Sequence, residues 1–147
     1  MAYLATQDLL DELGEDTLVK LTDDEATGAV NETRVLKAID FASGVFDSYA
    51  RSRYSIPVLT TPMVRSLNLD LAVYHLYKSR SQFAEGIYAI KKTAYEDAVK
   101  LLKDISTGRA ALDVPSATET ETLPANEDRI LTNAAKTTFT DDRLKSF

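Results

Sequence analysis

Carboxylate side chains gather in the stretch TDDEATGAVNE, residues 22–32, which has the outline of a calcium-binding loop. On that template Asp23 is the first ligand, Thr27 is a weak ligand and Gly28 occupies the turn position. The twelfth position requires a bidentate glutamate, and here it is Arg34, whose positive charge repels a cation. We therefore expect a tight turn and no bound metal.

The chain has one histidine, His75, and no cysteine. No carboxylate lies three or four residues from His75, so none would orient its ring on a helix, and Asp70 points elsewhere. The sequence also lacks glycine-rich phosphate loops, HExxH motifs and paired carboxylates in apolar surroundings. We expect a structural histidine, no cofactor and no enzyme activity.

Basic residues in the middle of the chain lie among tyrosines, a combination that can bind nucleic acid. The formal net charge of −6 argues against a dedicated nucleic-acid binder, which is usually basic. We favour a solvated helix surface and keep contact with nucleic acid as the alternative. The basic residues are Arg51, Arg53, Lys78, Arg80, Lys91, Lys92, Lys100 and Lys103.

Charge is divided unevenly along the chain. Residues 1–32 carry nine acidic groups and one lysine, whereas residues 33–108 carry eleven basic and seven acidic groups. Both segments are solvated faces on one interpretation. On the other, the acidic segment of one copy contacts the basic middle of the next, which forms a ring if the rotation closes.

The elements that would position these residues are helices. Apolar residues recur at steps of three and four, which predicts long helices over about 32–53, 62–81 and 84–107. A short helix capped by Thr6 stops at Gly14, and a second short turn follows over EDTLVKL. The predicted fold is all-α, with four principal helices in a domain of residues 1–108. The predicted N-caps of two long helices are Asn31 and Thr61, the latter followed by Pro62.

The same periods predict which side chains face the core. No apolar run is long enough to span a membrane. The expected inner residues are Val35, Leu36, Ile39, Ala42, Phe46, Tyr49 and Ala50, then Val64, Leu67, Leu71 and Tyr74, then Ile87, Ile90, Ala94, Ala98, Leu101, Leu102 and Ile105.

Two segments lie outside the predicted helices. The connector RSRYSIPVLTTP, residues 51–62, joins two long helices, and Pro57 holds the residue before it in an extended conformation. Residues 109–147 are polar, contain two prolines and cannot bury enough surface to order alone. They form either a disordered tail or an extended arm that orders on a neighbour.

Several stretches, in this order and spacing, resemble the Mu-like bacteriophage family of small neck proteins. They are MAYLATQDLLDELGEDTLVKLTDD, TGAVNETRVLKAIDFASGVFDSYARSRYSIPV, LAVYHLY and YEDAVKLLKDISTGRAAL. The combination includes a helix that ends in Arg–x–Arg–Tyr–x–x–Pro and a later helix that ends in Thr–Gly–Arg. The resemblance covers residues 1–112.

The resemblance implies a fold similar to the head–tail connectors of tailed phages, in which about twelve copies form a ring beneath the portal. It implies a structural virion protein of the phage neck, assembled in the host cytoplasm, with no catalytic residue. The implied partners are further copies of the chain, the portal protein and a tail-side neck or terminator protein. DNA passes through the lumen, and no membrane takes part. The alternative is a small regulatory or nucleic-acid-contacting adaptor.

The connector is the docking surface that we predict on this basis. Exposed ion pairs would guide register, and apolar side chains would supply most of the affinity. The predicted partner-binding residues are Arg51, Arg53, Tyr54, Ile56, Val58 and Leu59 of the connector, with Leu112, Val114, Phe139 and Phe147 of the arm.

Overall fold

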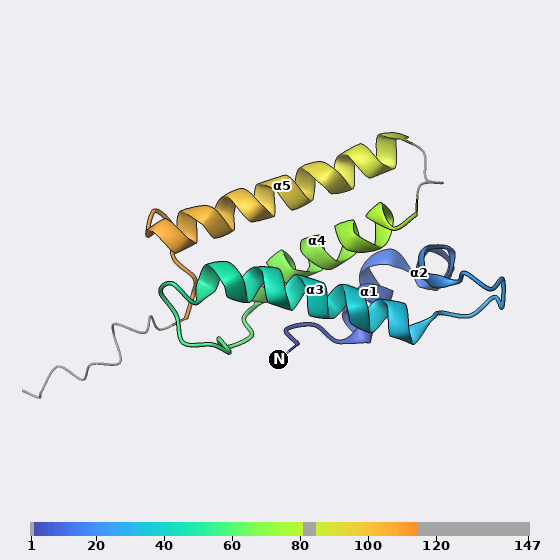
Figure 1. Ribbon diagram of the computed structural model, residues 1–147, viewed down its shortest axis with the longest axis horizontal. Coiled ribbons are helices and arrows are strands. Elements are labelled where there is room, and N and C mark those ends of the chain that lie inside the picture. Colours follow the sequence, from blue (N-terminus) through green and yellow to red (C-terminus); the bar gives the residue numbers. More distant parts are fainter. Residues whose placement is uncertain (1, 81–84, 115–147) are drawn as a thin grey trace, which may run out of the picture.

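The computed structural model describes residues 2–80 and 85–114, and the regular secondary structure within these ranges is helical (Figure 1). The all-α prediction is confirmed. The predicted turn over EDTLVKL is a complete helix, α2, of 8 residues. None of the helices in the described ranges combines the length and apolar character needed to cross a bilayer. The helices are α1 Thr6–Leu13, α2 Glu15–Thr22, α3 Glu32–Ala50, α4 Pro62–Lys78 and α5 Glu85–Thr107.

Helix α4 is the centre of the fold. It runs antiparallel to α3 and α5 and contacts all four other helices (Figure 1). The predicted inner residues Val64, Leu67 and Leu71 are buried, whereas Tyr74 is half-buried. Because neighbours surround α4, buried residues are found on several of its sides, and a single apolar stripe describes it poorly. Its buried residues are Val64, Leu67, Asn68, Leu71, Ala72, Val73, Leu76 and Tyr77.

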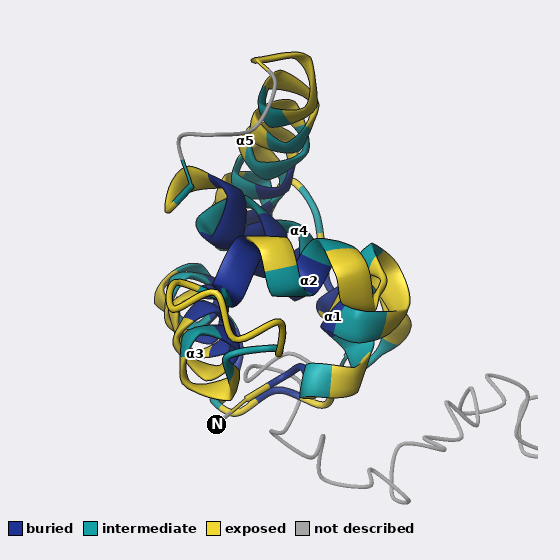
Figure 2. Cartoon of the chain, turned by 90° about the vertical axis from the view of Figure 1, so that its right-hand side faces the viewer, coloured by how far each residue is buried: buried dark blue, intermediate teal, exposed yellow. Residues whose placement is uncertain are grey.

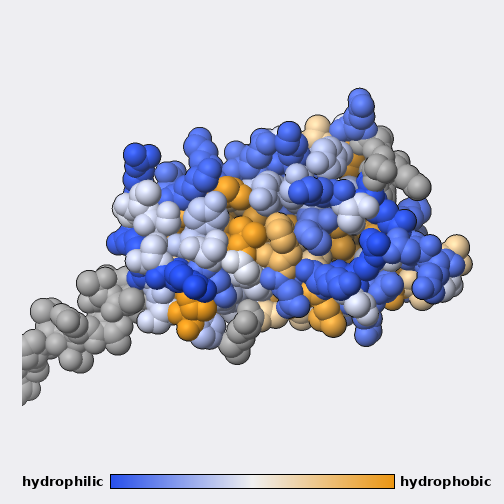
Figure 3. All heavy atoms as spheres, viewed as in Figure 1, coloured by the Kyte–Doolittle hydropathy of each residue, from blue (hydrophilic) through white to orange (hydrophobic). Residues whose placement is uncertain are grey.

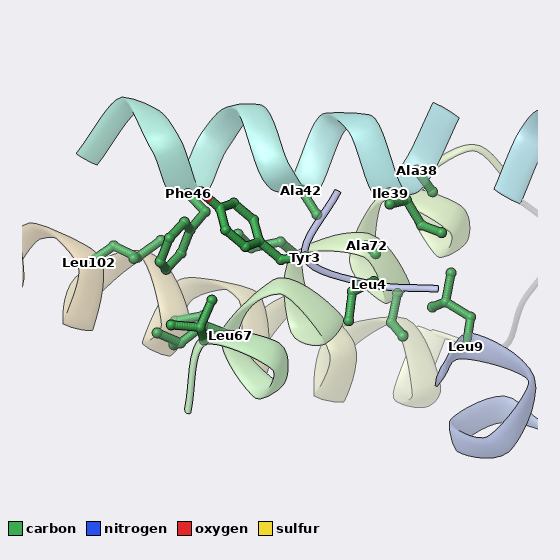
Figure 4. Close-up of a cluster of buried hydrophobic side chains, with 14 of the residues drawn as sticks. Tyr3, Leu4, Leu9, Ala38, Ile39, Ala42, Phe46, Leu67, Ala72 and Leu102 are labelled. Atoms are coloured by element: carbon green, nitrogen blue, oxygen red, sulfur yellow. The ribbon is translucent and has the colours of Figure 1, made fainter. Parts of the chain in front are cut away.

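The core joins the three long helices at the end where α3 and α5 finish. Phe46 of α3, Leu67 of α4 and Leu102 of α5 point toward one another there (Figure 4). All three are buried. Burying a side chain of this size contributes about 1.5–3 kcal/mol relative to leaving it in water. This cluster therefore fixes the connector end of the molecule.

Residues that precede α1 also enter the core, which the sequence analysis did not predict. Tyr3 packs edge-on against Phe46, with 4.9 Å between ring centroids. Its hydroxyl donates to the Asp47 carboxylate at 2.5 Å and accepts from the Val58 N–H at 3.3 Å. Tyr3 therefore ties the N-terminal segment to both α3 and the connector.

Two predicted N-caps are confirmed. The Asn31 side chain accepts a hydrogen bond from the Arg34 N–H at 3.3 Å, and the Thr61 hydroxyl accepts one from the Val64 N–H at 3.3 Å. Pro62 occupies the first turn of α4, where its missing N–H costs nothing. These caps set the two points at which α3 and α4 begin.

Three other helix ends differ from the prediction. The N-cap of α1 is Ala5 rather than Thr6, and the Ala5 N–H donates to the Asp8 carboxylate at 2.7 Å. Helix α3 ends at Ala50 and α4 ends at Lys78, each slightly before the predicted residue. The apolar period alone does not mark the last turn of a helix.

The first half of α5 has little cover. Its buried residues, Ala98, Leu102 and Ile105, all lie in the second half of the helix. Ile87 and Ile90, predicted to face the core, are 46% and 67% exposed, so that prediction is wrong. The helix has 23 residues and is therefore about 35 Å long, and its first half projects from the body (Figure 2).

Tyrosines hold this projecting half of α5 to α4. The Tyr74 ring of α4 stacks on Tyr95 of α5 with 4.2 Å between centroids, and the hydroxyls of Tyr74 and Tyr88 lie 3.5 Å apart. The neighbouring Tyr88 hydroxyl is the main cause that raises the pKa of Tyr74 to about 12. Three of the seven tyrosines therefore serve the contact between two helices.

Candidate interaction surface

The connector is held in place by some of the residues that were predicted to meet a partner. Tyr54 is 4% exposed, and its hydroxyl accepts a hydrogen bond from the Leu112 N–H at 2.9 Å. Val58 and Leu112 are buried in the same core. Tyr54, Val58 and Leu112 were predicted to bind a partner, whereas in the structure the subunit buries these three side chains in its own core.

Other predicted residues of the connector do reach the surface. Leu59 is 70% exposed, and Arg51, at the start of the connector, is also exposed. Ile56, Arg53 and Val114 are half-buried. Phe139 and Phe147 lie outside the described residues. A docking role for the exposed residues stays a prediction.

Two shallow hollows flank Leu59. One has a volume of about 380 Å³ and is lined by residues from Ala2, Tyr3 and the connector segment 57–60. The other, of about 350 Å³, is lined by Thr60 and by residues of the first turns of α4. Apolar atoms reach the surface near this end of the molecule and along the seam between α3 and α5 (Figure 3). The connector therefore presents one exposed apolar side chain, Leu59, which lines the first hollow, and Thr60 lines both.

The C-terminal ends of α3 and α5 meet at this same end of the molecule. The Ser52 hydroxyl donates to the Ser106 carbonyl at 3.3 Å. The Arg53 guanidinium lies against Gly108, so a Cβ at that glycine would stand 3.0 Å from an Arg53 nitrogen. A cation here complements the partial negative charge at the end of α5. Arg53 is therefore partly engaged within its own subunit.

The acidic loop after α2 is closed by its own backbone. The Asp23 carboxylate accepts hydrogen bonds from the N–H groups of Glu25, Thr27 and Gly28, the last at 2.7 Å. These bonds, that from Gly28 first, lower the pKa of Asp23. Among the described residues no group of three or more acidic or histidine side chains is arranged to hold a metal ion. The Asp23 carboxylate acts here as the organiser of a turn.

Arginines from α3, from α4 and from the segment that follows α4 neutralise part of the acidic segment within the subunit. Arg80 donates to the Leu21 carbonyl at 3.2 Å and to the Asp23 carbonyl, and it pairs with the Asp24 carboxylate at 2.8 Å. Arg34 pairs with the same Asp24 carboxylate. Another pair, Arg65 with Asp8, is 3.6 Å long. Several cations of the sequence's basic middle are therefore occupied inside the molecule.

His75 packs against an aromatic ring. Its ring stacks on Phe41 of α3 with 4.4 Å between centroids. Burial, followed by the nearby Lys78 charge, lowers the pKa of His75. A hollow of about 170 Å³ beside it is lined by Arg34, Lys37, His75, Leu76 and Ser79. These contacts give His75 a packing role between α3 and α4.

The exposure of Ile87, Ile90 and Leu36, the last 53% exposed, was not predicted from the sequence. A helical period reports which residues share a face, but it does not report whether another element covers that face. Nothing in the spacing separates Ile87 from the buried Ala98 of the same helix. The acidic excess of residues 1–32 was visible in the sequence, and the structure places four of these acidic residues, in the stretch DELGED, at the α1–α2 corner.

Comparison with known proteins gives the class to which this helical chain belongs. Residues 3–130 match the family described as "Bacteriophage Mu, Gp36", so the chain is a member of that phage family. A relative is the "Mu-like prophage FluMu protein gp36" of Haemophilus influenzae, 29% identical over 93 residues. The match covers 63% of the chain and 62% of the relative, which is less than two thirds of the relative's length. The resemblance to a Mu-like phage family is confirmed.

Proposed function

We propose that the chain is a head–tail connector subunit that forms a ring in the phage neck, between the portal and the tail, with DNA passing through the lumen. Membership of a Mu-like phage family supports a role in a phage particle. The partners in this proposal are neighbouring copies of the chain, the portal protein and a tail-side neck protein.

The observation that carries the proposal is the exposure of large apolar side chains at both ends of an elongated subunit. Leu59 stands in the connector at one end, and Ile90 stands on the projecting first half of α5 toward the other (Figure 1). The two surfaces differ in shape and neighbours, so one subunit offers two unlike faces. Unlike faces form heterologous contacts, which close into rings or extend into filaments.

The direct test is an image of purified virions, together with their protein content. We expect the chain to be present in virions and to occupy a symmetric collar between head and tail. Absence of the chain from virions, or its presence only in the capsid shell, would overturn the proposal. Salt-dependent binding of DNA by the isolated chain would instead favour a nucleic-acid adaptor.

A matched pair of variants tests the connector in the same particle. Leu59→Asp places a charge at the most exposed apolar position of the connector, and Ser55→Asp places the same charge at an exposed polar position nearby. We expect Leu59→Asp to leave the subunit folded and to reduce the yield of tailed particles at least tenfold. Ser55→Asp should assemble normally. Equal assembly by both variants would remove the connector from the interface.

A further inference from the structure

Two groups of exposed side chains of like charge lie at separate places on the molecule. One is the corner between α1 and α2, where Asp11, Glu12, Glu15 and Asp16 are all exposed, here called the acidic corner. The other is the end at which α3 and α5 finish, where Arg51, Lys100 and Lys103 are exposed, here called the basic end. Within the described residues, none of these seven side chains makes an ion pair.

Two of the four carboxylates of the acidic corner lie at a helix end that disfavours an anion, whereas Glu15 and Asp16 lie in the first turn of α2, where the helix dipole favours one. Asp11 and Glu12 lie in the last turn of α1, where the partial negative charge of the helix end disfavours an anion, and that turn contains no basic residue. Glu12 also lies close enough to Asp70 of α4 to add to the effect of burial, which raises the pKa of Asp70. Within the part of the chain that the structure describes, no cation of the same subunit forms an ion pair with the four carboxylates of the corner.

The basic end offers the complementary charge and lies beside the exposed apolar residue of the connector. The contact between Ser52 and Ser106 brings the ends of α3 and α5 together, and Leu59 belongs to the connector that leaves α3 there. Three other cations, Arg34, Arg65 and Arg80, pair with the chain's own carboxylates. Arg51, Lys100 and Lys103 remain free to meet a second molecule.

We propose that copies of the chain associate head to tail, with the acidic corner of one copy docked on the basic end of the next. The partner of each surface is a second copy of the same chain, because the same molecule carries both complementary charges at distinct sites. The two surfaces differ, so the contact is heterologous and leaves one free surface at each end of a pair. The head-to-tail contact is independent of the proposed function. Only the closure of successive contacts into a ring rests on that function.

Reversing the charge on each surface in a separate variant tests the contact. A mixture of the two variants should restore association, so the test does not depend on loss of association alone. The corner variant carries Glu15→Lys with Asp16→Lys, and the end variant carries Lys100→Glu with Lys103→Glu. All four positions are exposed and lie outside the buried core. A control for the end variant, Lys37→Glu with Lys78→Glu, makes the same change of charge as that variant at exposed positions elsewhere.

Sedimentation velocity of the full chain at low salt gives the readout. We expect the unchanged chain and the control variant to form concentration-dependent oligomers larger than dimers, and each reversed variant alone to associate at least tenfold more weakly. An equimolar mixture of the corner and end variants should associate again, because every contact in an alternating series then joins opposite charges. A chain that carries all four substitutions should do the same. Salt should weaken every association, as the Debye length falls from about 10 Å at 0.1 M to about 3 Å at 1 M.

Three outcomes would overturn the head-to-tail contact. They are a chain that stays monomeric up to about 1 mM, association that stops at a symmetric dimer, and a mixture of the two reversed variants that fails to recover. If virion images show the chain in the neck while the mixture fails, only this contact is wrong. If the mixture recovers while the chain is absent from virions, the contact stands and the connector function falls.

Discussion

Replacing Tyr3 by phenylalanine removes one oxygen atom that serves two elements at once. The Tyr3 hydroxyl donates to Asp47 of α3 and accepts from the buried Val58 N–H of the connector. The phenyl ring should keep its edge-on contact with Phe46. The substitution therefore isolates the polar contribution of a nearly fully buried side chain.

The expected loss of stability at pH 7 is about 2–3 kcal/mol. A buried N–H left without an acceptor costs about 1–3 kcal/mol. The bond to Asp47 adds less than a fully buried charged hydrogen bond would, because Asp47 is half-exposed and water replaces the lost donor. A loss of this size is a large fraction of the about 5–15 kcal/mol that stabilises a typical domain.

The same hydroxyl gives a second signature, in the dependence of stability on pH. Burial, with the hydrogen bond to Asp47 as the next cause, raises the pKa of Tyr3 to about 12. The phenol of the unfolded chain has a pKa near 10. The stabilising contribution is therefore complete below about pH 10 and is lost as the pH rises from 10 through 12, by about 2 kcal/mol. Tyr3→Phe cannot show this loss.

Urea unfolding followed by far-ultraviolet circular dichroism measures both effects. We expect the midpoint for Tyr3→Phe at pH 7 to fall by about 1–2 M, and the difference from the unchanged chain to shrink toward zero near pH 12. Tyr49→Phe is the control, since the Tyr49 hydroxyl makes no hydrogen bond within the described residues. Extrapolated free energies of unfolding are accurate to about 10–15%. If the free energy of unfolding of Tyr3→Phe at pH 7 lies within about 0.5 kcal/mol of that of the unchanged chain, the two hydrogen bonds do not contribute as described.

Three further substitutions probe single contacts. Arg80→Ala should speed hydrogen exchange across residues 23–30, because the guanidinium holds the Leu21 and Asp23 carbonyls; unchanged exchange there would contradict that role. Gly108→Ala should lower stability by about 1–3 kcal/mol in thermal unfolding, since φ is +83° and the new Cβ would meet Arg53. Asn68→Leu should be neutral or stabilising, because the buried Asn68 carbonyl oxygen has no partner among the described residues; a loss above about 2 kcal/mol would indicate that this oxygen is satisfied.

Local chemistry was the most predictable part of the fold. Asn31 and Thr61 were identified as N-caps because a short side-chain oxygen before an apolar period satisfies free backbone N–H groups over a few residues. The positions of the three long helices followed from the same short-range patterns. Caps and periods depend on neighbours in sequence, which the sequence displays directly.

Coverage by distant elements was not predictable. Ile90 and Ala98 lie on one helix and were assigned to the core together, but of the two only Ala98 is buried. Tyr54 was expected at the surface of the connector, and it is buried because the chain returns after α5 and places the Leu112 N–H on its hydroxyl. Contacts between residues more than fifty positions apart decide such cases.

For the candidate site, too, local features could be predicted from the sequence, whereas contacts between distant residues could not. Leu59 and Arg51 were identified as exposed connector residues, and the structure leaves both at the surface. The uneven charge of the chain was also evident, but its pairing was not. Arg80 belongs to the basic middle of the sequence, yet it lies against the acidic loop of its own subunit. Only the tertiary arrangement separates the cations that are occupied from those that remain free.

The central position of α4 has a consequence for how this sequence can diverge. Neighbours on several sides leave few positions of α4 at which a side chain can change size or polarity without disturbing another helix. The first half of α5 contains no fully buried residue, so folding alone constrains it weakly. In a library of random variants selected only for a folded chain, α4 should retain its residues while the start of α5 drifts. Any position at the start of α5 that resists change in a library selected for infectious phage is then under selection for something other than folding.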